Sequence, residues 1–177
     1  QLSGQSITLL HVATHGFYSP LTGHYTAQRS FEEQALSRSG LFLSGAAASL
    51  NMKKIPEDIE DGILTAKELS KLDLSNLNLA ILSACQTGLG EIVGDGVFGL
   101  QRGFKKAGAQ TLLMSLWKVD DTATQLLMAE FYKNLVSGQN KRAAFLNAQK
   151  YLRSYQNGIY DKPEYWAAFI LSLIHIS

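Results

Sequence analysis

Hydrophobic and polar positions along the chain alternate between two kinds of segment. Short apolar runs of strand length occupy residues 7–14, 40–44, 79–84, 110–117 and 166–173. Longer segments with helical spacing occupy residues 65–72, 96–107, 121–136 and 141–153. In the third of these, Ala123, Leu127, Phe131 and Leu135 recur at every fourth position, which is typical of one buried helix face. Strands that alternate with helices predict an α/β domain with a mostly parallel sheet covered on both faces.

Local signals set some of the element boundaries. Thr65 is followed three residues later by Glu68, which is the spacing of a capping box at a helix start. Gly108 follows the second helical segment, where a glycine commonly ends a helix. The polar stretch 17–38 has no clear period, and the charged segment 51–62 is predicted to be a surface loop.

Two residues with the chemistry of a nucleophilic pair follow apolar runs. The run 7–14 leads into His15, and the run 79–84 leads into Cys85. In an open α/β sheet, ligands and chemistry collect outside the carboxyl ends of the strands. A base and a thiol at two such ends predict a catalytic pair, whatever their separation in sequence.

The same positions offer the other parts of an acyl-transfer site. An imidazole can take the thiol proton and return it to the leaving amine. Gly16 has no Cβ, so its N–H can approach a substrate closely, and the Cys85 N–H is the natural second donor of an oxyanion hole. The other interpretation stays open, because a lone cysteine after an apolar strand is commonly a packing residue. His11, inside the first apolar run, is predicted to be a core-facing, hydrogen-bonded structural residue.

Composition narrows the classes of function. The 177 residues fit one domain, and a net charge of +1 argues against nucleic acid as a partner. The single cysteine allows no internal disulfide, which favours a reducing, cytoplasmic location. The sequence shows no metal-ligand spacing, and no cofactor-binding motif stands in the structural context that it needs. No apolar run approaches the length of a membrane helix. The start at Gln1, almost directly in strand sequence, suggests a fragment of a longer chain.

Several blocks of the sequence, in order, resemble the CHAT domain family of caspase-like cysteine peptidases, which is related to separases and caspases. The blocks are HVATHG, DGILTAKEL, LAILSACQTGLGE, GDGVFGLQRGFKKAGAQTLLMSLWKVDDTAT and YWAAFIL, between about Ile7 and Leu171. The resemblance implies a three-layer αβα caspase-like sandwich and an endopeptidase that acts on a protein or peptide with His15 and Cys85. It also implies a preceding helical region of tetratricopeptide repeats. We take residues 1–171 as the domain and leave the tail 172–177 out of the functional argument, because it departs from the end of the family pattern.

A further match concerns substrate specificity. The segment from Ser115 to Asp121 is similar to a separase segment whose final acidic residue helps to receive an arginine side chain. The resemblance therefore implies that Asp121 provides the counter-charge for a basic P1 residue. Asp120 is equally near, and the alternative role for Asp121 is that of a helix N-cap.

Two other functions remain possible at this stage. The first is a catalytically silent CHAT module that serves as a regulated interaction domain. The second is a dinucleotide-binding domain, because residues 94–99 satisfy G-x-G-x-x-G and Asp120 follows at a suitable distance. The context disfavours this second function, because the preceding apolar run ends at Ala84 and the first glycine of such a motif belongs at the end of the strand.

Overall fold

A computed structural model describes residues 3–18, 36–51, 61–83 and 95–173 of the chain. The elements in chain order are β1 (Leu9–Val12), β2 (His15–Tyr18), β3 (Ser39–Phe42), α2 (Ala46–Asn51), β4 (Ile63–Thr65), α3 (Ala66–Leu69), β5 (Leu79–Leu82), α4 (Asp95–Lys106), β6 (Thr111–Ser115), α5 (Asp121–Val136), α6 (Lys141–Ser154), a 3₁₀ turn (Tyr155–Asn157), α7 (Pro163–Trp166) and β7 (Phe169–Leu173).

The larger sheet, sheet A, has the strand order β1-β5-β6-β7. Strands β1, β5 and β6 run parallel, and β7 pairs antiparallel to β6. The prediction of a mostly parallel sheet is therefore confirmed. The last strand reaches Leu173, and the Ser172 hydroxyl accepts a hydrogen bond from Gln101 Nε2 at 2.8 Å.

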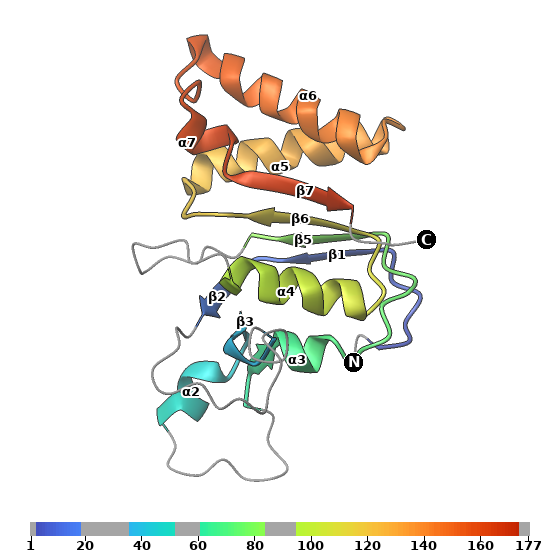
Figure 1. The fold of residues 1–177 in the computed structure, drawn as a ribbon. Helices are drawn as coiled ribbons and strands as arrows, with labels where there is room; N and C mark the ends of the chain where they lie inside the picture. The colour runs from blue at the N-terminus through green and yellow to red at the C-terminus, as the bar shows by residue number, and fades with distance from the viewer. Residues whose placement is uncertain (1–2, 19–35, 52–60, 84–94, 174–177) are drawn as a thin grey trace.

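Helices cover both faces of sheet A, with α4 on one face and α5 and α6 on the other (Figure 1). The side chains of its strands alternate between two hydrophobic cores. Ala80 and Leu82 of β5 belong to the first core, which includes α3, α4 and part of β3. Ile81 belongs to the second core, which α5 and α6 cover. Because neighbouring residues of a strand point to opposite faces, a strand buried on both sides is apolar throughout, and every residue of β5 is buried.

A second, smaller sheet was not predicted. In this sheet B, β2, β3 and β4 pair antiparallel in that order. The predicted strand 7–14 ends at Val12, and His15–Tyr18 forms a separate strand on the other sheet. Gly40 is required at the centre of sheet B, since a Cβ there would lie 2.6 Å from the Leu64 carbonyl oxygen.

The local signals at helix ends are confirmed. The Thr65 hydroxyl accepts from the Glu68 N–H at 3.1 Å, and the Glu68 carboxylate accepts from the Thr65 N–H at 2.9 Å, which completes the capping box of α3. Gly108 has a φ of +95°, the left-handed conformation that lets the chain turn away after α4. The short helix α2 was not predicted, and residues 52–60 of the expected loop lie outside the described residues.

Candidate active site at the carboxyl ends of the strands

The register of sheet A brings the two candidate segments to one edge. Val12, the last residue of β1, pairs directly with Leu82, the last residue of β5, and the two strands are parallel. His15 is the third residue after Val12, and Cys85 is the third residue after Leu82. The two adjacent strands therefore end at the same level, three residues before His15 and three residues before Cys85 in the sequence. Cys85 itself lies outside the described residues.

His15 is held at the start of β2 by contacts around it. It pairs with Phe42 across sheet B, and the Thr14 hydroxyl donates a hydrogen bond to the Phe42 carbonyl. The rings of Phe17 and Phe42 pack with their centroids 4.9 Å apart. The His15 residue is exposed, and its imidazole forms no hydrogen bond with the described part of the chain. Gly16, the predicted oxyanion donor, lies opposite Leu41 in the same ladder.

The acidic pair lies at the same edge, because β6 runs parallel to β5 and ends at Ser115. The Asp120 carboxylate accepts from the Ala123 N–H at 2.8 Å and is the N-cap of α5. Asp121 is the first residue of that helix, and it is exposed. The structure thus assigns to Asp120 the cap role that we considered for Asp121, and this leaves the Asp121 carboxylate with no part in the cap.

Aromatic residues of the C-terminal segment border this edge, and sequence reasoning missed them. The Trp117 indole N–H donates to the Glu164 carbonyl at 3.2 Å. Desolvation, followed by the charge of Asp120, raises the pKa of the Tyr160 phenol. The rings of Tyr160 and Tyr165 lie 5.2 Å apart. The sequence shows these aromatic residues, but they have no periodic spacing that would place them together.

His11 differs from its prediction in one respect. The residue lies on the edge strand and is exposed, so it is not part of the buried core. It is hydrogen-bonded as expected, with Nε2 at 3.2 Å from the Ser83 hydroxyl and Nδ1 at 2.8 Å from the Tyr132 hydroxyl. Partial burial lowers the pKa of His11 and raises that of Tyr132. The network joins β1, the end of β5 and helix α5.

Other kinds of site find little support in the described part of the chain. No three His, Cys, Asp or Glu side chains are grouped there as metal ligands. None of the described helices combines the length and the apolar character of a membrane span. The first glycine of the G-x-G-x-x-G motif lies outside the described residues, and β5 already ends at Leu82. A dinucleotide turn would require that glycine at the end of the strand.

Comparison with known proteins agrees with the sequence resemblance. The chain is a mixed α/β domain with candidate residues at the carboxyl edge of a mostly parallel sheet. The sequence profile described as "CHAT domain" matches residues 1–173, so the chain belongs to the CHAT domain family.

The curated relatives are much longer proteins. The chain is 36% identical over 109 residues to mouse tetratricopeptide repeat protein 28, and the match covers 62% of this chain and 4% of that protein. It is 34% identical over 113 residues to the human protein of the same name, and this match covers 64% of this chain and 4% of that protein. The chain thus spans only a small part of the relatives that it matches.

Proposed function

We propose that this domain is a cysteine endopeptidase of the caspase and separase type, in which His15 is the base and Cys85 the nucleophile. The observation that carries the proposal is the position of the two residues relative to two strand ends that pair directly with each other. Each follows its strand by three residues, after Val12 and Leu82. Membership of the CHAT family supports the same assignment.

The proposed chemistry follows from the two side chains. The His15 imidazole removes the Cys85 thiol proton, and the thiolate attacks the carbonyl carbon of a peptide bond. The N–H groups of Gly16 and Cys85 donate to the oxyanion of the tetrahedral intermediate. The imidazolium then protonates the leaving amine, and water hydrolyses the thioester to regenerate the thiol.

We also propose the wider setting that the family implies. The helices on both faces of sheet A support a three-layer αβα caspase-like sandwich. The relatives named for tetratricopeptide repeats support a helical repeat region elsewhere in the full protein. A cytoplasmic location fits a free thiol nucleophile, which a reducing compartment protects.

Alkylation of the cysteine tests the dyad without a known substrate, because the chain contains a single Cys. We expect iodoacetamide to label wild-type protein well below the ordinary thiol pKa of about 8.5. His15→Ala should shift the pH profile of labelling toward that ordinary value. A wild-type profile like that of an ordinary thiol, unaffected by His15→Ala, would refute the dyad.

In a cleavage assay, Cys85→Ala and His15→Ala should both abolish turnover and leave the circular dichroism spectrum intact.

Asp121 is proposed to receive a basic P1 side chain. A carboxylate pairs with a guanidinium in a bidentate manner, so we expect a preference for Arg over Lys. Because Asp120 provides the cap, Asp121→Asn should remove the charge and change stability by less than about 0.5 kcal/mol. Profiling with a peptide library should show the loss of basic P1 selectivity in this variant. Wild-type selectivity for apolar P1 residues would contradict the assignment and leave the dyad untouched.

A silent interaction module is the second candidate function. It is supported by the relatives, whose names refer to tetratricopeptide repeats and to no enzyme activity. The alkylation experiment separates the two candidates, because a module without catalysis has no need of a thiol whose reactivity depends on His15.

A further inference from the structure

A hollow lies at the opposite end of sheet A from the candidate active site. It has a volume of about 340 Å³ and lies beside the first residues of β1, β5 and β6 and the turn between α5 and α6. Leu9, Leu79 and Leu135 line its apolar part, and Asn78, Gln110 and Lys141 line its polar part. This volume and this mixture of an apolar wall with a few polar groups are typical of small-molecule sites.

Lys141 is the charged group of the hollow. Its Nζ donates to the Asn78 carbonyl and to the Thr111 hydroxyl, both at 2.9 Å, and Thr111 is almost fully buried. These two bonds leave the third N–H of the ammonium available. Both partners are neutral, and no carboxylate of the described residues forms an ion pair with Lys141. Burial lowers the pKa of this lysine, as expected for a cation without a counter-charge.

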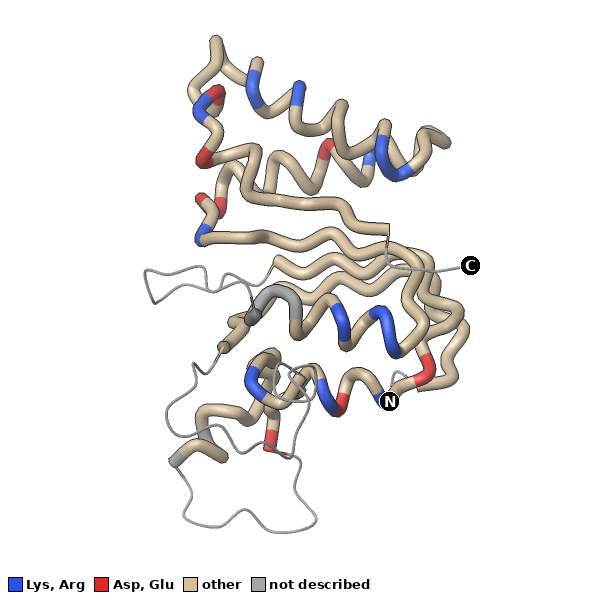
Figure 2. Tube along the Cα trace, viewed as in Figure 1, with Lys and Arg blue, Asp and Glu red and all other residues tan. Residues whose placement is uncertain are grey.

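Two carboxamides add further donors beside the ammonium. Asn78 Nδ2 donates to Gln110 Oε1 at 3.0 Å, so one N–H of Asn78 and both of Gln110 remain available. Helix α6, which begins at Lys141, contains four basic residues and no acidic one (Figure 2). The hollow therefore offers hydrogen-bond donors and positive charge, and none of the described residues that line it is acidic.

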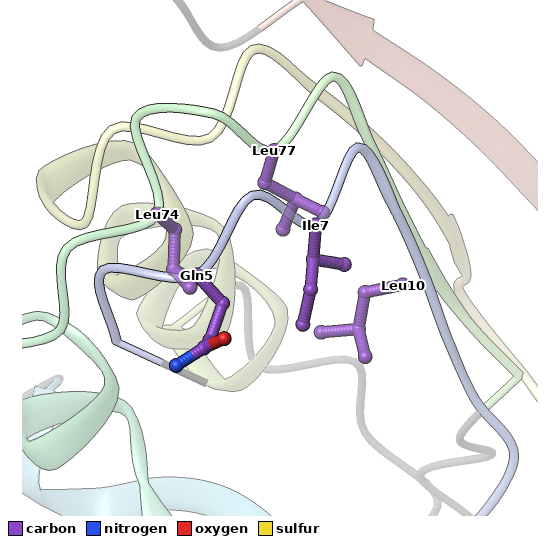
Figure 3. A pocket seen from close by; sticks show the side chains of 5 residues that line it. All are labelled: Gln5, Ile7, Leu10, Leu74 and Leu77. Atoms are coloured by element: carbon purple, nitrogen blue, oxygen red, sulfur yellow. The ribbon is translucent and has the colours of Figure 1, made fainter. Parts of the chain in front are cut away.

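A second hollow, on the other side of β1, lacks these properties. It has a volume of about 10 Å³, roughly the room for one water molecule. The aliphatic side chains of Ile7, Leu10 and Leu77 lie together there, and the Gln5 carboxamide points away from them (Figure 3). It has neither the space nor the charge to select a ligand.

We propose that the hollow at Lys141 is a binding site for an aliphatic carboxylate. The carboxylate accepts hydrogen bonds from the Lys141 ammonium and the Gln110 carboxamide, and the aliphatic chain lies against Leu9, Leu79 and Leu135. A charged hydrogen bond to a partly buried ammonium is about twice as strong as a neutral one. The same chemistry is found in a small free acid and in the C-terminus of a peptide that ends in an aliphatic residue.

The experiment is a titration of ¹⁵N-labelled protein with pentanoate, followed by nuclear magnetic resonance. We expect saturable shifts at the side-chain amides of Asn78 and Gln110, and at least tenfold weaker binding of pentanol, which lacks the charge. N-acetylleucine and its amide form the second arm. Tighter binding of N-acetylleucine than of pentanoate identifies a peptide C-terminus as the ligand, and the reverse order identifies a free acid.

Two variants test the role of the charge. Lys141→Met keeps most of the side-chain stem and removes the ammonium, and we expect at least tenfold weaker pentanoate binding. Gln110→Glu keeps Lys141 and adds a competing carboxylate, so it should weaken pentanoate binding as strongly while thermal unfolding shows a folded protein. Lys133→Met on the exposed face of α5 is the matched control and should bind as wild type does. Absence of saturable shifts in the wild type, or unchanged affinity in Gln110→Glu, overturns the proposal.

Discussion

The imidazole of His11 lies at an exposed strand edge, yet both of its nitrogens have hydrogen-bond partners. Ser83 and Tyr132 can each donate or accept, so they suit either neutral tautomer of the ring. The cost of protonation therefore comes from partial burial, which is the cause of the lowered pKa. Tyr132, whose own pKa is raised, stays neutral at pH values at which histidine titrates.

This lowered pKa predicts a pH dependence of stability. Because the folded-state pKa of His11 lies below its unfolded value of about 6.5, the unfolded chain binds more protons around that pH. The contribution to stability is full above about pH 6.5 and is lost as the pH falls below it. Urea unfolding of the wild type between pH 7.5 and pH 5 should therefore show a steeper loss of free energy than His11→Gln. Equal slopes in the wild type and His11→Gln would contradict the prediction.

At the scale of single residues, the sequence predicts those contacts that form between residues close together in the chain. The bonds between Thr65 and Glu68 follow from a spacing of three residues, and the structure has both. The surroundings of His11 depend on Tyr132, which is 121 residues away, so no local pattern could place them together. The dyad of His15 and Cys85 was predicted from its position after two strands, and it stays a prediction because Cys85 lies outside the described residues.

Among the elements, long periodic segments were predicted best. The helix expected over 121–136 has those bounds in the structure, and α6 ends one residue later than expected, at Ser154. Strand β2 was missed because it is short, lies next to a segment without period and is stabilised by pairing with β3. Such pairing depends on contacts between residues distant in sequence, which local patterns do not reveal.

The pairing in sheet B predicts a strict requirement at Gly40. A Cβ there would lie 2.7 Å from the Phe17 ring as well as close to the Leu64 carbonyl oxygen. The carbonyl belongs to the backbone of β4 and cannot move without disturbing the sheet. We expect Gly40→Ala to lower the free energy of unfolding by about 1–3 kcal/mol, as overpacking commonly does.

Chemical denaturation measures this loss, and a second variant tests its cause. In a Phe17→Leu background the ring contact is relieved and the carbonyl contact remains, so Gly40→Ala should cost less there but should still destabilise. Gly40→Ala with wild-type stability would show that sheet B can adjust to a side chain at this position.

The whole molecule is organised around sheet A, whose strands contribute to two cores at once. Leu112 and Met114 of β6 face the first core, and Leu113 between them faces the second. The alternation of strands and helices in the sequence predicted such a sheet. It did not predict the antiparallel direction of β7, because the connection from β6 to β7 through α5, α6 and α7 has no local signal of strand direction. The shared strands imply that the two cores unfold together.

Truncation of one core tests this coupling. Phe104 on α4 is almost fully buried in the first core, whereas both tryptophans, Trp117 and Trp166, pack against the second. Phe104→Ala should cost about 3–5 kcal/mol. Because β5 and β6 form a wall of both cores, tryptophan fluorescence and far-ultraviolet circular dichroism should report one shared transition at lower denaturant concentration than in the wild type. Phe131→Ala, in the second core, should shift both signals in the same way. A fluorescence midpoint that stays at its wild-type value in Phe104→Ala, while the dichroism signal changes earlier, would show that each core is stable without the other.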